Sequence, residues 1–276
     1  MKRLFALFFV LNIFIFSQEG TFERTYFEGI GQYVKEAPDG GYLVASTSPV
    51  YSNDTLVKLD ISKLDFQGNL LWTMKNVTNA YDSYQFDVSK TGDIYVPGYT
   101  LENNKDIELV KLDQNGNIIW KKSFGKSDTS EVGLAVKVTS DNHILLVGRT
   151  KTSQLFYRYY FEDFIFLMLD ETGNPVWEKR HPFSRNYLSF YGENILELRD
   201  SSYVIMERGK MLRISKEGTI LWETPSDFIG YSIVKKNESE IFVGSLGNIN
   251  RYDLNGNLIS SNSLSGRITN IGVPGM

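Results

Sequence analysis

One motif recurs along this chain, and its clearest copy is Leu112-Asp113-Gln114-Asn115-Gly116-Asn117-Ile118-Ile119-Trp120. It reads as the end of one strand, a tight turn and the start of a second strand. An Asp or Ser opens such a turn by accepting hydrogen bonds from backbone amides two residues further on. Glycine takes the left-handed conformation that reverses the chain. The apolar strand then leads to a tryptophan, which can bury about 150–250 Å².

Five copies of this hairpin share the same offsets. Their glycines are Gly68, Gly116, Gly173, Gly218 and Gly256. The turns open with Asp65, Asp113, Asp170, Ser215 and Asp253. The first four copies end in Trp72, Trp120, Trp177 and Trp222, and the fifth has Ser260 at that place. Self-similarity at a nearly constant period indicates a repeat architecture.

A second hairpin precedes each copy, as in the strand Ala135–Val138, the turn at Asp141 to His143 and the strand Ile144–Val147. Each unit therefore offers four short antiparallel strands, the size of one propeller blade. A small residue follows the second strand in four units, where neighbouring sheets can approach closely; these residues are Ala45, Gly98, Gly148 and Gly244. Sheets this apolar must pack face to face, so we predict an all-β fold, a β-propeller of five to six four-stranded blades.

The predicted repeat units lie within a single domain, residues 18–276; they span residues 30–76, 82–126, 132–182, 190–225 and 229–263. Thr21–Phe27 matches the last strand of a unit, and Arg267–Ile271 matches the first strand. We therefore expect the amino-terminal and carboxy-terminal strands to close the ring. Five blades with a shared closure and a sixth partial blade both fit this pattern.

The amino terminus has the pattern of a signal peptide. Lys2 and Arg3 precede the apolar run Leu4–Phe16, which is shorter than the roughly 20 residues that cross a bilayer as a helix. We expect cleavage after Ser17, no membrane span in the mature chain, and a secreted, periplasmic or cell-surface location. An uncleaved membrane anchor is the alternative.

Composition excludes several classes of function. The 276 residues include no cysteine and two histidines, and the net charge is −4. There is thus no disulfide, thiolate metal site or cysteine nucleophile, and no basic surface typical of nucleic-acid binding. The Asp-x-Asn-Gly-Asn runs at Asp113 and Asp253 lack the Glu that a calcium loop needs at its twelfth position, where Phe124 and Leu264 stand. We expect no metal, no cofactor, surface-exposed His143 and His181, and a monomer.

The segment from Leu169 to Trp177 resembles the tryptophan-docking repeat of pyrroloquinoline-quinone-type β-propellers, and Asp39–Thr47 and Asp141–Thr150 resemble repeats of secreted bacterial propellers. The resemblance covers about residues 21–276. It implies that the four tryptophans dock onto a neighbouring blade. Quinone enzymes of this type often carry an adjacent cysteine pair over the cofactor, and the similar lipoprotein scaffold that helps insert outer-membrane proteins needs an anchoring cysteine. A chain without cysteine departs from both.

The candidate ligand-binding residues lie in the longest interval between motif glycines, and they are Tyr157, Arg158, Tyr159 and Tyr160. Aromatic rings and an Arg in a loop can stack on sugars or form a protein-binding hot spot. The structural alternative is that these rings cover a neighbouring loop or extend the strands. We predict an exported, non-catalytic propeller that binds a protein or glycan partner through a loop-lined face.

Two other functions stay open. A carbohydrate-active enzyme would need two carboxylates facing each other in the central funnel, one with a raised pKa. The paired acids in the sequence are Asp82 with Asp87, Asp128 with Glu131, and Glu162 with Asp163, and we read them as solvated loop acids rather than catalytic residues. The third possibility is a scaffold subunit of a cell-surface or envelope assembly, whose closing strands come partly from a partner.

Overall fold

The structure is a computed structural model that describes residues 30–47, 57–80, 85–101, 105–126, 128–151, 163–182, 195–207, 210–224, 230–245 and 247–263. All regular elements of these residues are strands, so the all-β prediction is confirmed. The strands are β1 (Ile30–Glu36), β2 (Tyr42–Thr47), β3 (Val57–Leu64), β4 (Leu70–Ala80), β5 (Asp87–Val88), β6 (Ile94–Tyr99), β7 (Ile107–Leu112), β8 (Ile118–Phe124), β9 (Ser130–Val138), β10 (Ile144–Lys151), β11 (Asp163–Leu169), β12 (Pro175–Pro182), β13 (Ile195–Glu197), β14 (Tyr203–Glu207), β15 (Lys210–Ile214), β16 (Ile220–Glu223), β17 (Gly230–Lys235), β18 (Glu240–Ser245), β19 (Asn248–Asp253) and β20 (Leu258–Ser263).

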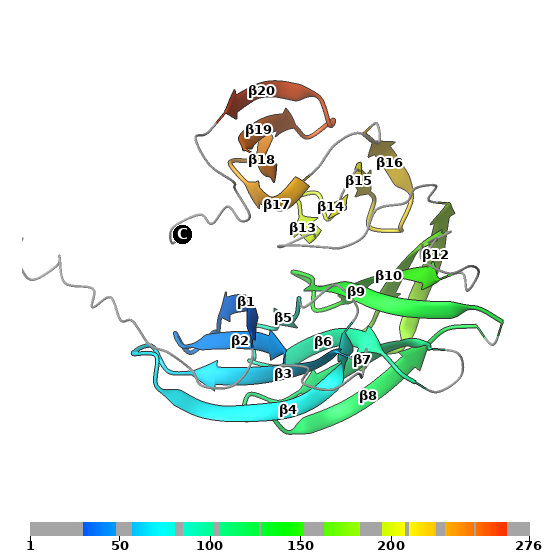
Figure 1. The fold of residues 1–276 in the computed structure, drawn as a ribbon. Coiled ribbons are helices and arrows are strands. Elements are labelled where there is room, and N and C mark those ends of the chain that lie inside the picture. The colour runs from blue at the N-terminus through cyan, green and yellow to red at the C-terminus, as the bar shows by residue number, and fades with distance from the viewer. Residues whose placement is uncertain are drawn as a thin grey trace, which may run out of the picture.

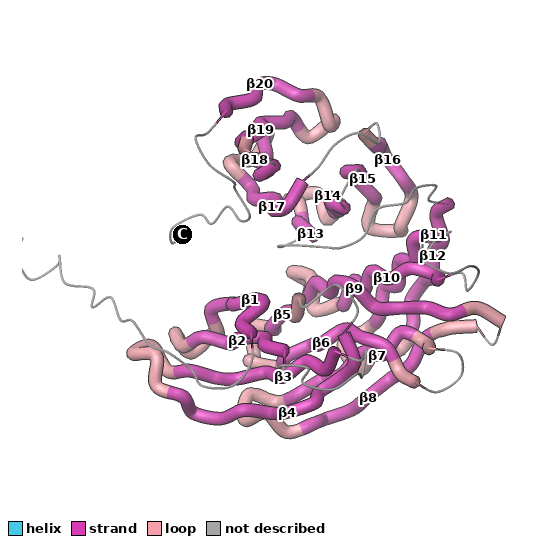
Figure 2. The backbone as a smooth tube through the Cα atoms, viewed as in Figure 1, coloured by secondary structure: helices cyan, strands magenta, loops and turns pink. Residues whose placement is uncertain are grey.

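The strands form five antiparallel meanders of four, which follow one another around a common centre as the blades of a β-propeller (Figure 1). Blade one is β1–β4, blade two β5–β8, blade three β9–β12, blade four β13–β16 and blade five β17–β20. The first strand of each blade lies toward the centre and the fourth lies at the periphery (Figure 2). One backbone pair, Asn79 with Tyr99, also links β4 to β6, so blades one and two share a continuous sheet.

Ten tight turns connect the first strand to the second and the third to the fourth in every blade. In each turn the amide of the first residue donates to the carbonyl of the fifth, as from Asp113 to Asn117 at 2.8 Å. The Asp113 carboxylate also accepts bonds from the amides of Asn115 and Asn117, both at 2.8 Å. Gly116 has a φ of +84°, which residues with a Cβ avoid. Strands alternate in direction within each meander, so the turns after the first and third strands lie at the same end of the sheet. All ten turns therefore lie at one face of the propeller, which we name the turn face.

The hydrophobic core is divided into layers between successive blades. One cluster fills each of the four junctions from blade one to blade five. Neighbouring residues of β10 alternate between two of these layers: Ile144 packs toward blade two and Leu145 toward blade four. Strand β11 is buried over six of its seven residues. Because successive side chains of a strand point to opposite faces, each internal sheet packs against the blade on either side of it.

Tryptophans tie each blade to the next. The Trp72 indole donates to the carbonyl of Gln114, Trp177 to that of Lys216 at 3.1 Å, and Trp222 to that of Leu254 at 2.8 Å. In all four cases, Trp120 included, the ring lies against the turn glycine of the following blade; the pairs are Trp72 with Gly116, Trp120 with Gly173, Trp177 with Gly218 and Trp222 with Gly256. A Cβ on any of these glycines would stand 2.8–2.9 Å from the ring. Glycine is therefore required for two reasons: the turn has a positive φ, and the ring leaves no room for a Cβ.

The small residues after the second strand also mark close approaches between sheets. A Cβ on Gly98 would stand 2.3 Å from the Thr78 hydroxyl and 2.4 Å from the Asn79 carbonyl of blade one. A Cβ on Gly148 would stand 2.5 Å from Ile107 of blade two. The prediction of close sheet contact is therefore confirmed at these two positions.

Every outer strand contains a β-bulge at the same place, where one residue has no partner on the neighbouring strand. The unpaired residues are Leu71, Ile119, Val176, Leu221 and Ile259. All five are aliphatic and 41–57% exposed. Bulges bend and twist an edge strand, which discourages pairing with another edge. These exposed side chains thus sit on strands whose geometry opposes edge-to-edge association.

Several predicted features lie outside the described residues. They are the signal peptide at residues 1–17, the two closing segments at 21–27 and 267–271, and the aromatic run at 157–160. Ring closure and the choice between five and six blades therefore stay predictions.

Candidate functional site

The two faces of the propeller differ in construction. The turn face consists of the ten short, hydrogen-bonded turns. The opposite face, which we name the loop face, receives the connections between the second and third strands and between successive blades. These include residues 48–56, 152–162 and 183–194, all outside the described part. The ten hydrogen-bonded turns thus lie at one face, and the described strands that flank the longer connections end at the other.

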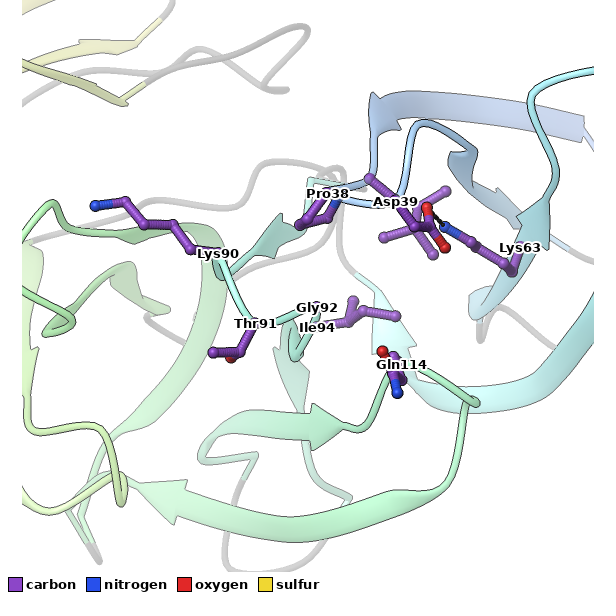
Figure 3. A pocket seen from close by; sticks show the side chains of 10 residues that line it. Pro38, Asp39, Lys63, Lys90, Thr91, Gly92, Ile94 and Gln114 are labelled. Atoms are coloured by element: carbon purple, nitrogen blue, oxygen red, sulfur yellow. Dashed lines mark hydrogen bonds and ion pairs between the residues drawn. The ribbon is translucent and has the colours of Figure 1, made fainter.

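A pocket of about 230 Å³ opens at the turn face between blades one and two. Its walls come from the β1–β2 turn, the β5–β6 turn and the β7–β8 turn (Figure 3). Its apolar lining includes Leu43 and Ile94. The polar lining residues are Asp39, Lys63, Lys90, Thr91 and Gln114.

An ion pair already occupies one wall of this pocket. The Lys63 ammonium donates to Asp39 Oδ1 at 2.5 Å (Figure 3), and only 5% of Lys63 is exposed. The bond from Lys63, followed by the one from the Gly41 amide, lowers the pKa of Asp39. Since these two charges satisfy each other, the pocket offers a ligand mainly Thr91, Gln114 and the exposed Lys90. It suits a small polar molecule rather than a chain of sugars.

Three charged side chains from the innermost strands of blades one, two and three meet near the centre. Asp87 of β5 lies 2.6 Å from the ammonium of Lys35 in β1 and 3.5 Å from that of Lys137 in β9. Its second oxygen also accepts the Val138 amide at 2.8 Å. Burial of Asp87 opposes ionisation, but the charges of Lys35 and Lys137 outweigh it and lower the pKa of Asp87. This ion triad fastens three blades together.

The prediction that the paired acids are solvated loop acids is wrong for Asp87 and Glu131. Asp163 begins strand β11 and is half-buried, and Asp82 and Glu162 lie outside the described residues. Only 2% of Asp87 and none of Glu131 is exposed, because both lie on innermost strands rather than in loops. Asp128 is exposed as predicted. The carboxylate that faces Glu131 is Asp106, from blade two, and burial followed by the charge of Glu131 raises the pKa of Asp106.

The proposed ligand-binding residues Tyr157, Arg158, Tyr159 and Tyr160 lie outside the described residues, but both ends of their connection are described. Strands β10 and β11 pair without interruption from Ile144 with Leu169 to Arg149 with Phe164. The Asp163 amide donates to the Thr150 hydroxyl at 3.0 Å. The connection between β10 and β11 therefore begins and ends on a buried, regular pair of strands at the loop face.

The two histidines lie in polar surroundings at the surface of the turns and edges. His143 is 3.2 Å from Asp141, and His181 is 3.0 Å from Glu223 of blade four. Both imidazoles keep a quarter or more of their side-chain surface exposed. Within the described ranges, no group of three or more His, Asp or Glu side chains is arranged to hold a metal ion.

The ion pairs between blades are not predicted by the sequence analysis. Lys35, Asp87 and Lys137 occupy equivalent places before the first turn of three units, so alignment of the units reveals their alternating charge. That alignment is the one signal that points to the ion triad. Asp106 has no such signal, because it precedes a strand in a connection whose length differs between units.

Comparison with known proteins supports the fold. No protein-family model matches the chain, and no curated protein is detectably similar in sequence. A protein of unknown function from Bacteroides caccae matches in structure with a TM-score of 0.56 and 9% identity, over 81% of this chain and 73% of that one. The α-L-arabinanase of Penicillium chrysogenum, a β-propeller, matches with a TM-score of 0.53 and 9% identity, over 85% and 77%.

A third structural match is BamB from Moraxella catarrhalis, with a TM-score of 0.39 and 15% identity, over 85% of this chain and 74% of that one. The first two matches, at 9% identity, show the fold alone. The described residues contain no helix of the length and apolar character needed to cross a membrane.

Proposed function

We propose that the protein is an exported, non-catalytic β-propeller that binds a protein or glycan partner through its loop face. Export follows from the signal-peptide pattern of residues 1–17. The observation that carries the binding proposal is the contrast between the two faces. Ten short turns close one face, and the longer connections all leave from the other. Binding residues concentrate on loops that a rigid scaffold positions.

Rigidity of the scaffold favours this use. A tryptophan contact and at least one further hydrogen bond or ion pair cross each described junction; examples are Lys121 to the Val77 carbonyl at 2.7 Å and Lys216 to Asp141 at 2.7 Å. We also infer that the repeat is of the tryptophan-docking type, since each indole lies on the turn glycine of the next blade. Because the scaffold is already ordered, binding through its loops costs little conformational entropy in the scaffold.

The proposed contact residues are Tyr157, Arg158, Tyr159 and Tyr160. Tyr offers a large amphipathic surface at low entropic cost, and Arg adds a planar, charged donor group. Both side chains stack on sugar rings and serve as hot spots between proteins. The chemistry therefore suits either class of partner, and a binding screen has to separate them.

A glycan array and affinity capture test the proposal directly. The triple variant Tyr157→Ala, Tyr159→Ala and Tyr160→Ala should lose the signal that the unaltered protein gives. Phe66→Ala is the matched control, because Phe66 is an aromatic residue on the turn face with 64% exposure. If the triple variant binds as well as the control, the assignment of the site is wrong.

A carbohydrate-active enzyme is the second candidate, and one observation favours it: Asp106 and Glu131 come from different blades, and the pKa of Asp106 is raised. Against it, Glu131 is wholly buried and its carboxylate contacts Arg180 at 3.3 Å. Hydrolysis of arabinan or other plant and microbial glycans, abolished by Glu131→Gln, would establish the enzyme. No hydrolysis across such a panel would leave the binding proposal preferred.

A scaffold subunit of an envelope assembly is the third candidate. Gel filtration coupled to light scattering distinguishes it, because a scaffold that borrows closing strands should associate with its own kind or with a partner. A stable mass of one chain supports the independent binding protein that we propose.

A further inference from the structure

Blade one has a face that no described blade covers. In blades two to five, the residue three places before the first turn packs into the cluster shared with the preceding blade; these residues are Phe86, Val136, Ile195 and Ile233. All four are at most 5% exposed. The equivalent residue of blade one is Val34, which is 60% exposed. The central part of this face of blade one is therefore open.

The outer edge of the same face is closed at its turn glycine. Gly68 has a φ of +79° and is buried. Gly116, Gly173 and Gly218 have the same left-handed conformation and are buried too, each under a tryptophan of the preceding blade. All four tryptophans of the sequence lie on other turn glycines. A buried outer edge beside an open centre fits one outer strand against blade one rather than a complete blade.

Phe22 holds the tryptophan place in the chain before blade one. The four tryptophans precede the opening residues of the next first turn, Ser89, Thr139, Leu198 and Lys236, by 17, 19, 21 and 14 residues. Phe22 precedes Ala37, which opens the first turn of blade one, by 15 residues. The spacing therefore allows Phe22 to lie on Gly68 as each tryptophan lies on its glycine.

The residue two places after the aromatic ring supports the same match. Lys122 and Lys179 follow Trp120 and Trp177 by two, and their stems lie 3.0 and 2.8 Å from the point that a Cβ on Gly173 or Gly218 would occupy. The Lys122 ammonium also donates to Asn174, the last residue of that turn, at 2.8 Å.

Arg24 follows Phe22 by two, and Asn69 is the last residue of the equivalent turn in blade one. Arginine has the same apolar stem and cationic end as lysine. Arg24 can therefore take the place of Lys122 beside the turn glycine and bond the Asn69 side chain.

We propose that residues 21–27, which we name the strap, form an outer strand against blade one, with Phe22 on Gly68 and Arg24 bonded to Asn69. The sequence predicts that the amino-terminal strand helps to close the ring; the proposal names the surface and the side chains that hold it. The strap occupies the fourth-strand position, so the centre around Val34 stays open.

The strap contact is weaker than the tryptophan contacts. Trp72, Trp177 and Trp222 each donate an indole hydrogen bond to the carbonyl of the second turn residue. Phenylalanine has no such donor for the equivalent carbonyl, that of Phe66, and its ring is smaller than an indole. We therefore expect the ring of blades to open first at the strap.

Cross-linking tests the contact directly, because the chain has no cysteine of its own. In the double variant Arg24→Cys and Asn69→Cys, a short bismaleimide should join the two thiols within one chain. Arg24→Cys with Asn117→Cys is the matched control, since Asn117 ends the same turn in blade two, and it should stay unlinked. Failure of the test pair to link, or equal linking of the control, would overturn the proposal. Linked dimers would overturn it too, because a second copy would then supply the strap.

Urea unfolding tests the ring contact. Gly68→Ala strains the turn in any background, but it crowds the ring only where Phe22 is present. It should therefore lower the folding equilibrium constant about tenfold more in the unaltered chain than in Phe22→Ala. Equal effects in the two backgrounds would contradict the contact.

Two further variants separate the strap from a general effect of the amino terminus. Phe22→Trp should raise the urea midpoint, because an indole can donate to the Phe66 carbonyl. Thr25→Ala should leave the midpoint unchanged, because Thr25 points to the opposite side of the strand from Phe22 and Arg24. A loss in Thr25→Ala as large as that in Phe22→Ala would also overturn the proposal.

Discussion

Single residues at the centre of the propeller show how buried charge is used to join blades. Asp87 is almost fully buried, and yet the neighbouring ammonium groups of Lys35 and Lys137 keep its pKa below the ordinary value. A carboxylate in this position satisfies two cations and two backbone amides together, those of Val88 and Val138. Removing the charge costs more than a neutral hydrogen bond would, because both ammonium groups keep their desolvation penalty.

Asp87→Asn should lower the free energy of unfolding by about 2–3 kcal/mol at neutral pH, at the low end for a buried pair because both lysines keep some exposure. A lowered carboxyl pKa stabilises the fold above the unfolded value near 4 and loses that effect as the pH falls through the folded pKa. The difference between variant and unaltered protein should therefore shrink below about pH 4. Urea unfolding over a pH series measures it, and a constant difference would contradict this account of Asp87.

Residue-scale contacts of this kind are the part that sequence predicts least. Turn residues act locally, so Asp113 and Gly116 could be interpreted from spacing alone. Asp87 and Glu131 read as loop acids because their partners, Lys35 and Lys137 for Asp87 and Arg180 for Glu131, lie far away along the chain. Register between blades decides such contacts, and no property of one strand reveals it.

At the scale of elements, a turn glycine and a tryptophan together fix the outer hairpin of one blade to the next. The turn glycine supplies the left-handed φ, and the tryptophan of the preceding blade covers it. Both halves could be predicted from their regular offsets, and the resemblance to tryptophan-docking propellers implied the contact between them. The bulges at Leu71 and its equivalents could not, because a bulge leaves no mark in the alternation of so short a strand.

Substitutions at Trp177 test this contact between tryptophan and turn glycine. Trp177→Phe keeps a ring over Gly218 but loses the bond to the Lys216 carbonyl, and should cost about 1 kcal/mol. Trp177→Ala removes the ring contact as well and should cost about 3 kcal/mol. Ser260→Ala, at the equivalent place in blade five, should stay within about 0.5 kcal/mol of the unaltered protein. Urea unfolding orders the three variants, and equal effects of Trp177→Phe and Trp177→Ala would rule out the packing contribution.

The bulge residues offer a second test at this scale. Val176 is 55% exposed in a bulge, whereas Val110 is fully buried between blades one and two. Val176→Thr should change stability by less than about 0.5 kcal/mol, and Val110→Thr should cost about 1–3 kcal/mol because it buries a hydroxyl. A loss at Val176 as large as that at Val110 would mean that the bulge side chain is packed, contrary to its exposure in this fold.

At the scale of the whole molecule, the same contact between a tryptophan and a turn glycine joins each blade to the next, from blade one to blade five. The four tryptophans join four junctions, and the fifth copy has Ser260 in place of the next one. The all-β class and the propeller followed from repetition, since sheets that are apolar on both faces must stack. Partner and compartment did not follow, because a fold that hosts many functions says little about any one of them.

This arrangement makes one claim central: a rigid, interlocked frame presents its loop face to a partner. The most direct measurement compares capture of glycans and proteins by the unaltered chain, by the Tyr157, Tyr159 and Tyr160 triple alanine variant, and by Phe66→Ala. We predict that the loop-face variant loses the captured ligand and that Phe66→Ala keeps it, with equal melting temperatures for all three. Retention of the ligand by the triple variant, or its loss in Phe66→Ala, would contradict the account.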